Sequence, residues 1–208
     1  MRHLHQKPLK LLWISICMGL FLAVSIQLIG DFFGDCGEIR ESVLRLHILA
    51  NSDTQKDQQL KLDVRDRILE ETEDLFNQID SVNSAKQTAE EHLEEITAIA
   101  QQEVWRQGYD YPVKTQVCRM FFDTRNYENF SLPAGQYDAV RITIGEAKGH
   151  NWWCVLYPPL CLPAAMPEEE LESDLTPRQA DMIEHPEHYQ VRFAVVELWE
   201  KLKISLAS

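Results

Sequence analysis

The chain begins with its longest uninterrupted apolar run. Residues 11–30 (LLWISICMGLFLAVSIQLIG) contain no charged side chain, and three basic residues but no acid precede them. Such a run is long enough to cross a bilayer, and a basic flank followed by an apolar run is typical of an export signal. We therefore expect residues 1–10 to form a basic cytoplasmic n-region and residues 38–208 to form a single exported domain. No small-residue cleavage motif ends the run, so residues 11–30 are either a signal peptide or a membrane anchor.

Alternation of apolar and polar residues predicts a strand over residues 42–50. Leucine and isoleucine side chains fall on one face of this strand, whereas Arg45 and His47 fall on the other. The polar residues Asn51, Ser52 and Asp53 follow directly. They are good N-cap residues, so they predict that a helix starts here.

Helical spacing of apolar residues predicts two amphipathic helices after this strand. The first runs from Thr54 to Phe76 and starts with a capping box formed by Ser52 and Gln55. The second runs from Ser84 to Gln107. Arg65 falls inside the apolar arc of the first helix, so we expect it to have a carboxylate or carbonyl partner.

The second half of the chain is richer in strand patterns. Strands are predicted over residues 113–123, 136–145 and 152–157. Residues 126–135 indicate a loop. The polar residues 145–151 indicate a hairpin connection between the last two strands.

The C-terminal part contains a predicted short helix over residues 176–184 and a final helix over residues 191–204. The candidate core anchors of the final helix are Phe193, Val196, Leu198 and Trp199. The resulting order, β-α-α-β-β-β-α, predicts an α+β fold. We expect a two-layer sandwich in which an antiparallel sheet of about four strands carries helices on one face.

The charge distribution excludes a protein whose main task is to coat nucleic acid. The chain has 33 acidic and 20 basic residues, and three of the basic residues but none of the acids precede residue 31. The part of the chain that follows residue 30 therefore carries a formal charge of −16. A surface of this charge repels phosphates, so we expect no nucleic-acid partner.

Common catalytic motifs are missing from the sequence. It contains no Gly-rich phosphate loop after a strand, no H-E-x-x-H, no G-x-S-x-G and no pair of C-x-x-C motifs. His47, His92 and His150 fall on three different predicted elements. The sequence therefore indicates neither a set of metal ligands nor a cofactor-binding site.

Cys154 and Cys161 flank a Pro-Pro turn. In an exported protein this spacing favours a local disulfide between them. The alternative is an exported enzyme, such as a cell-wall hydrolase, that uses Cys154 as a nucleophile or uses the loop of Glu146 and His150.

A further group of candidate residues lies where the first strand meets the first helix. Helix capping accounts for Asn51 and Asp53, but it accounts less well for Arg45 and His47. We therefore hypothesise an exposed interaction patch at this position.

Two parts of the chain resemble a known family. R-L-H-I-L-A-N-S-D at 45–53 with L-K-L-D-V-R-D at 60–66, and Y-D-A-V-R-I-T-I-G-E-A-K-G-H-N-W-W-C-V-L-Y-P-P-L-C at 137–161, resemble the stage II sporulation protein R family. The resemblance implies a protein made in the forespore and exported to the intermembrane space, either secreted or anchored through residues 11–30. There it would activate a membrane-embedded aspartic protease, stage II sporulation protein GA, so that the sigma-E precursor is cleaved in the mother cell.

The resemblance implies a signalling ligand and brings no catalytic residues with it. We expect contact with the protease through two groups of residues, which belong to the two similar segments. The candidate interaction residues are Arg45, His47, Asn51, Asp53, Arg65, Glu146, Lys148, His150, Asn151, Trp152 and Trp153.

Overall fold

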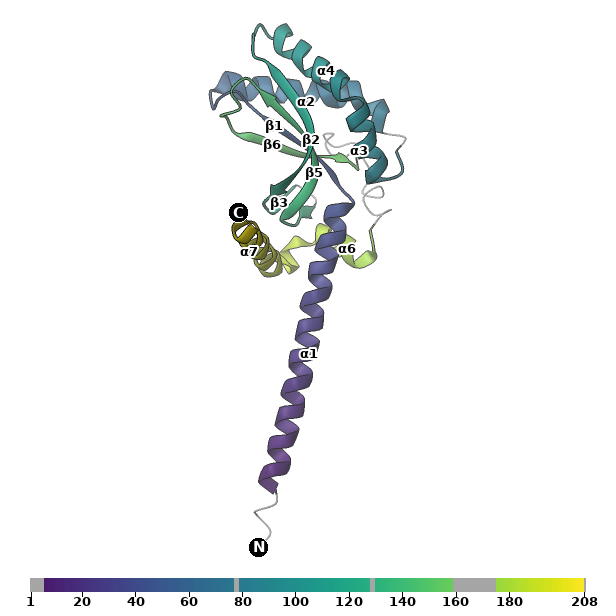
Figure 1. Ribbon diagram of the computed structural model, residues 1–208, viewed down its shortest axis with the longest axis vertical. Coiled ribbons are helices and arrows are strands. Elements are labelled where there is room, and N and C mark those ends of the chain that lie inside the picture. The colour runs from purple at the N-terminus through teal and green to yellow at the C-terminus, as the bar shows by residue number, and fades with distance from the viewer. Residues whose placement is uncertain (1–5, 77–78, 128–129, 159–174, 208) are drawn as a thin grey trace. The chain divides into compact units, whose positions relative to one another are not determined.

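The computed structural model describes residues 6–76, 79–127, 130–158 and 175–207. The chain divides into two compact units, Met1–Glu38 and Ile39–Ser208. Helix α1 (Gln6–Glu41) makes up the described part of the first unit, and its last three residues belong to the second unit (Figure 1). Among the described residues, α1 is the one helix long and apolar enough to cross a membrane. This finding supports the expected signal or anchor segment.

The second unit is built on a four-stranded sheet. Its strands, in spatial order, are β2 (Val113–Phe122), β5 (Gly135–Ile144), β1 (Leu44–Leu49) and β6 (Asn151–Tyr157). β1 and β5 run parallel, whereas β1 with β6 and β2 with β5 run antiparallel. The α+β fold is confirmed, but the sheet is mixed instead of antiparallel.

The predicted hairpin over residues 145–151 is wrong, because β1 lies between β5 and β6. Nearly every residue of β1 is buried, on both faces of the strand. A strand buried in this way is best placed with a neighbour on each side. β1 therefore takes a central position, and the chain from β5 to β6 must pass over its end.

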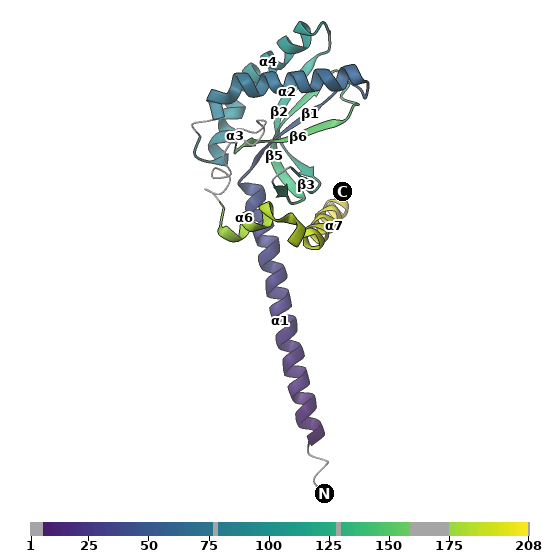
Figure 2. The same ribbon diagram turned by 180° about the vertical axis from the view of Figure 1, so that it is seen from behind.

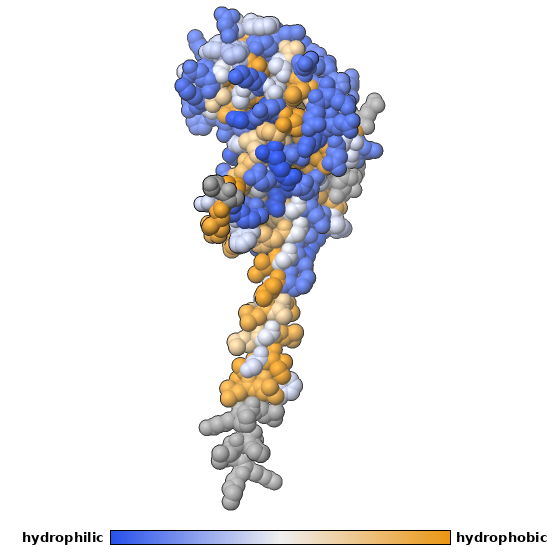
Figure 3. Space-filling model, viewed as in Figure 1, coloured by the Kyte–Doolittle hydropathy of each residue, from blue (hydrophilic) through white to orange (hydrophobic). Residues whose placement is uncertain are grey.

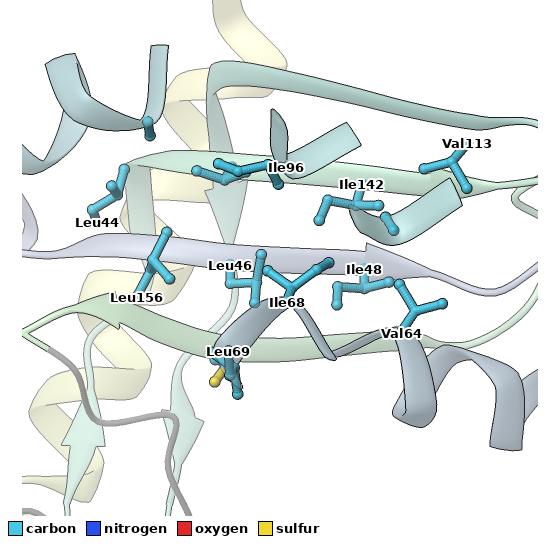
Figure 4. Packing of buried hydrophobic residues seen from close by; sticks show 14 of the residues in the cluster. Leu44, Leu46, Ile48, Val64, Ile68, Leu69, Ile96, Val113, Ile142 and Leu156 are labelled. Carbon is cyan, nitrogen blue, oxygen red and sulfur yellow. The ribbon is translucent and has the colours of Figure 1, made fainter. Parts of the chain in front are cut away.

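Three helices cover one face of the sheet (Figures 1 and 2). They are α2 (Gln55–Phe76), α3 (Val82–Glu91) and α4 (Leu93–Arg106). Leu46 and Ile48 of β1 and Ile142 of β5 point toward Val64 and Ile68 of α2, and all five belong to one buried cluster (Figure 4). This cluster is the core of the two-layer sandwich that the alternation predicts.

The predicted helix over residues 84–107 is two helices. The chain leaves the helical conformation at His92, where φ is −99° and ψ is 16°. The buried residues Ala85 and Ala89 before the break, and Ile96 and Ala100 after it, keep helical spacing across it. The apolar pattern therefore gave no sign of the break.

The second face of the sheet is partly covered by a short hairpin. Its strands are β3 (Arg125–Asn126) and β4 (Ser131–Leu132), which pair antiparallel. Both lie within or beside residues 126–135, which were predicted as a loop. Leu132 is fully buried, so this segment packs against the unit instead of extending into solvent.

The C-terminal helices match their predicted positions. They are α6 (Pro177–Glu184), the short 3-10 helix η1 (Pro186–His188) and α7 (Gln190–Ala207). Phe193 and Val196 of α7 are buried, as expected. Leu198 is 71% exposed and Trp199 is 49% exposed, so their prediction as core anchors is wrong. Leu198 lies on the side of α7 that faces away from Phe193 and Val196, and Trp199 lies at the flank of the helix beside Val196.

Candidate functional site

The connection from β5 to β6 crosses the end of β1 and joins the two family-like segments. The backbone N–H of Lys148 donates to the carbonyl of Asn51 at 3.1 Å, and that of Gly149 donates to the carbonyl of Ala50 at 3.0 Å. We call residues 50–53 together with residues 145–150 the crossover junction. It brings side by side two segments that lie about 95 positions apart in the sequence.

Asn51 is the central side chain of the crossover junction. Its Oδ1 accepts a hydrogen bond from the backbone N–H of Glu146 at 2.9 Å, and its Nδ2 donates to Asp57 Oδ2 at 2.9 Å. Ser52 Oγ donates to the same Asp57 oxygen at 2.5 Å. Burial alone would raise the pKa of Asp57, but these hydrogen bonds hold it below its ordinary value. Asn51 therefore ties the loop to the start of α2.

The predicted capping box at Ser52 is not formed. Thr54 Oγ1 instead accepts the backbone N–H of Asp57 at 3.3 Å, so Thr54 caps α2. Ser52 uses its hydroxyl on the Asp57 side chain. The capping residue is Thr54 instead of Ser52 because the Ser52 hydroxyl is hydrogen-bonded to the carboxylate of Asp57.

Two glycines allow the loop to approach β1 so closely. Gly145 has φ +59°, and a Cβ placed there would lie 2.2 Å from Asn51 Oδ1. A Cβ at Gly149 would lie 2.2 Å from the carbonyl oxygen of Ser52. A side chain at Gly149 would have to move the backbone of Ser52, and one at Gly145 would have to displace the Asn51 side chain and adopt a strained positive φ, so both positions favour glycine.

The outer rim of the crossover junction is charged and solvent-exposed. His150 donates its backbone N–H to Asp53 Oδ1 at 2.6 Å, and its ring Nδ1 lies 2.5 Å from the same oxygen. These contacts from His150 lower the pKa of Asp53. Glu146 and Lys148 form a second ion pair at 2.7 Å. All four side chains are 54% to 79% exposed, so a partner protein can reach them.

Lys61 supports this rim from beneath. It is 5% exposed, and its Nζ donates to the carbonyl of His150 at 3.1 Å and to Gln58 Oε1 at 2.6 Å. Burial lowers the pKa of Lys61. The loop is therefore fixed from both β1 and α2, which makes the rim a rigid surface.

Arg65 has the carboxylate partner that its position predicted. Its Nε donates to Asp66 Oδ1 at 2.7 Å, and its guanidinium lies 4.3 Å from the ring centre of Trp152. Trp152 is in β6 directly after the crossover junction. Stacking of this kind links α2 to the edge strand of the sheet.

Arg45 is fully buried, so the exposed patch expected at Arg45 and His47 is wrong. The Arg45 guanidinium lies 4.1 Å from the ring centre of Phe122 and 4.9 Å from that of Tyr137, and its Nη2 donates to Tyr127 Oη at 2.5 Å. We call these three rings the aromatic cage. The sequence pattern placed Arg45 on the face opposite the helices but gave no sign that the β3–β4 hairpin covers that face.

The charge of Arg45 is poorly compensated inside the aromatic cage. Its Nε and Nη1 have no hydrogen-bond partner among the residues that the structure describes. Burial lowers the pKa of Arg45, and the proximity of Tyr127 opposes this shift. Cation–π contacts with the cage rings are the main favourable interactions of this guanidinium.

His47 lies next to the aromatic cage and is 3% exposed. Its ring stacks on Trp153 with 4.2 Å between ring centres, and Arg125 lies 5.1 Å from the Trp153 ring centre. Burial, with smaller effects of nearby arginines, lowers the pKa of His47 to about 4. The nearby side chain of Asn151 opposes this lowering of the His47 pKa, although neither ring nitrogen of His47 has a hydrogen-bond partner among the described residues. His47 is therefore neutral at pH 7.

The structure divides the predicted interaction residues into three groups. The rim residues and Asn51 meet at the crossover junction, whereas Arg45, His47 and Trp153 lie on the second sheet face. Arg65 and Trp152 form a separate contact between α2 and β6, and Asn151 is the first residue of β6. The partners that sequence reasoning missed there are Phe122, Arg125, Tyr127 and Tyr137. No periodic pattern connects Tyr127 with β1, because a tertiary contact alone brings them together.

Cys154 does not lie in the crossover junction. It is 5% exposed and belongs to the core cluster under the helices, whereas His150 is an exposed loop residue. This separation disfavours a Cys154 nucleophile that His150 would activate. Cys161 lies outside the described residues, so its disulfide with Cys154 stays a prediction.

The described residues define an α+β domain that follows an N-terminal apolar helix and presents a rigid, charged loop junction. Comparison with known proteins identifies its family. The model of the family "Stage II sporulation protein R" matches residues 40–166, which include the whole sheet and the crossover junction. The chain belongs to the stage II sporulation protein R family, and a role in sporulation follows.

A curated relative agrees with this assignment. The chain is 36% identical over 156 residues to stage II sporulation protein R of Bacillus subtilis (strain 168), an alignment that covers 71% of this chain and 70% of the relative. No solved structure matches the chain.

Proposed function

We propose that this protein is an exported sporulation signal that acts by direct contact. It is exported from the forespore to the intermembrane space, where it activates the membrane-embedded aspartic protease stage II sporulation protein GA. The protease then cleaves the sigma-E precursor in the mother cell. Family membership and the N-terminal apolar helix support this proposal.

The observation that carries the proposal is the crossover junction. Both family-like segments contribute to it, and its rim exposes Asp53, Glu146, Lys148 and His150 on a backbone fixed by hydrogen bonds. A rigid surface loses little conformational entropy on binding, so such a rim suits recognition of a partner. This rim is the contact surface for the protease.

Activation requires that the signal bind the active arrangement of the protease more tightly than the inactive one. A ligand shifts a two-state equilibrium only by its difference in affinity for the two states. The rim therefore contacts a surface of the protease that differs between the two states. No catalytic group of the signal is needed for this effect.

The test is reconstitution in non-sporulating cells. This protein, the protease and the sigma-E precursor are co-expressed, and the precursor size is followed by immunoblot. We expect cleavage only when this protein is present. Absence of cleavage, with this protein exported and folded and the protease competent, would contradict the proposal.

A matched pair of charge reversals tests the contact surface. Glu146→Lys changes the rim, whereas Glu94→Lys makes the same charge change at an exposed position of α4. We expect the first variant to reduce cleavage by at least about fivefold, which corresponds to ~1 kcal/mol of lost contact energy. The second variant should behave as the wild type.

The competing function is an exported enzyme that uses the loop of Glu146 and His150. These residues are exposed and carry polar groups, which is the observation in favour of it. An enzyme would release a product from cell-wall substrate without the protease present. A catalytic role also predicts that His150→Ala abolishes activity, whereas a contact role predicts a partial loss.

A further inference from the structure

Helix α7 exposes a continuous apolar surface. The residues of this exposed stripe are 48% to 79% exposed, and they are Val191, Val195, Leu198, Trp199, Leu202 and Leu206. Their spacing of three or four residues places them on one side of the helix. Orange side chains gather over α7 near the C-terminal end of the chain in Figure 3. An apolar patch of this size marks a surface that another apolar phase covers.

The inward side of α7 is the more polar one. Beside the buried Phe193 and Val196, it directs two carboxylates at the domain. Glu197 Oε2 accepts the backbone N–H of Thr124 at 3.2 Å, and Glu200, which is 6% exposed, lies 3.7 Å from Arg40. A helix on the surface of a soluble protein has the opposite arrangement, with polar residues outside. The orientation of α7 therefore suits an apolar environment on its outer side.

The ion pair between Glu200 and Arg40 places α7 at the entrance of the domain. Arg40 is the second residue of the unit that begins at Ile39, and its Nη1 also donates to the carbonyl of Ala134 at 3.1 Å. The apolar run of α1 ends at Gly30, only a few residues earlier. Even a fully extended connection from Gly30 to Ile39 spans only about 30 Å. A bilayer that holds α1 therefore lies within about 30 Å of the start of the second unit, which Glu200 of α7 contacts through Arg40.

The charges on α7 point to a neutral apolar contact. The exposed stripe contains no ionisable side chain, and two lysines of α7 are paired with the acids of its inward side: Lys201 lies 2.7 Å from Glu197, and Lys203 lies 2.7 Å from Glu200. Over its whole length α7 has three basic residues (Arg192, Lys201 and Lys203) against two acids, an excess of a single charge that attracts anionic headgroups only weakly. Trp199 adds an indole, a side chain that favours the boundary between headgroups and acyl chains.

We propose that α7 lies on the bilayer into which α1 inserts, with its exposed stripe buried at the boundary between headgroups and acyl chains. The occupant of this surface is a lipid bilayer, and anionic lipid is not required. α7 is then a second, reversible membrane contact of the domain. This contact goes beyond the proposed activation of the protease and does not depend on it.

Photo-crosslinking to lipid tests the proposal. The full chain is reconstituted in phosphatidylcholine vesicles with p-benzoylphenylalanine at position 198 or at position 105. Trp105 of α4 is a matched control, because it is a large apolar residue that is 59% exposed on a different helix. We expect lipid adducts at position 198, at least about tenfold above those at position 105, because only the first side chain enters the bilayer. High salt should leave the yield unchanged.

Each other outcome overturns the proposal. Crosslinks from position 198 to a second copy of the chain would show that the exposed stripe is a self-association surface. Equal lipid yields at positions 198 and 105 would show that the adducts come from random collision. Absence of adducts at position 198, with the chain inserted in vesicles and the photoprobe reactive, would show that the stripe faces water.

A charge variant supplies a second measurement. With the photoprobe at position 195, the double substitution Leu198→Glu and Leu202→Glu should lower the lipid yield by about tenfold, since buried carboxylates are costly in lipid. Gln102→Glu, at an exposed position of α4, should leave the yield unchanged. Far-UV circular dichroism confirms that both variants are folded. An unchanged yield in the double variant would contradict the proposal.

Discussion

The segment from Arg45 to Asp53 enters two environments within nine residues. Its first half places Arg45 and His47 on a buried face among aromatic rings, while its second half forms the exposed crossover junction. Both halves contain polar residues, yet only the second half exposes a charged side chain, that of Asp53, to solvent. The segment 45–53 therefore combines buried residues that stabilise the domain with exposed residues that are available for contact with another protein. Stability and activity measurements separate the two.

The largest expected effect is loss of stability on truncation of Arg45. Arg45→Ala leaves a cavity within the aromatic cage, so the free energy of unfolding should fall by about 3–5 kcal/mol. Arg45→Met fills most of the volume without a buried charge and should cost less than about 1.5 kcal/mol. Urea denaturation of the two variants measures the difference. A wild-type value for Arg45→Ala would show that the cage contributes little.

The next effect is a pH dependence that comes from His47. Its pKa of about 4 in the folded state is below its ordinary value, so the unfolded state binds more protons between these two pH values. Stability should therefore be complete above about pH 6.5 and should fall by as much as ~3 kcal/mol as the pH drops toward 4. Denaturation curves for the wild type and His47→Phe check this, because the variant should lose most of the slope. An equal slope in both proteins would assign the pH dependence to other groups.

The crossover junction has a smaller structural requirement at Gly149. Gly149→Ala forces a methyl group against the carbonyl of Ser52, so we expect a loss of about 2 kcal/mol in unfolding free energy. Gly108→Ala is a control in open space, and its φ of +83° adds a backbone strain that Gly149 does not have. The control should lose only about 1 kcal/mol from backbone strain. Equal losses would show that the close approach of the loop to β1 is easily relaxed.

The smallest structural effect is expected at the rim of the crossover junction. His150→Ala removes an exposed contact with Asp53, so the melting temperature should stay within about 2 °C of the wild type. Cleavage of the sigma-E precursor should nevertheless fall if the rim is the contact surface for the protease, as proposed. A variant with lowered melting temperature and normal cleavage would reverse the division between the two halves of the segment.

Local patterns were sufficient for most elements of the fold. Alternation located β1 and β5, and the strand-like composition of residues 113–123 and 152–157 located β2 and β6. The order of the strands did not follow from alternation, since it depends on which neighbours β1 finds. The same limit applies at the site. Residues 51–53 were predicted to cap a helix and residues 145–151 to form a turn, but the contact between these two segments is tertiary.

Exposure was harder to predict than secondary structure. Arg45 and His47 were expected at the surface because their side chains are polar, yet the β3–β4 hairpin and the aromatic cage cover them. Leu198 and Trp199 were expected inside because they are apolar, yet α7 exposes them. Both errors have one cause. Burial depends on what lies beyond the element itself, and the sequence of the element does not contain that information.

The parallel pairing of β1 with β5 also determines at which stage of folding the crossover junction can form. Leu44 pairs with Asp138, so the sheet closes only after most of the domain has emerged and a long intervening segment has folded. Contacts of such high sequence separation form late and slowly. An unfolded chain carries both segments of the crossover junction but not the surface that they make. Under the proposed function, the contact surface for the protease would therefore exist only once the domain has folded after export.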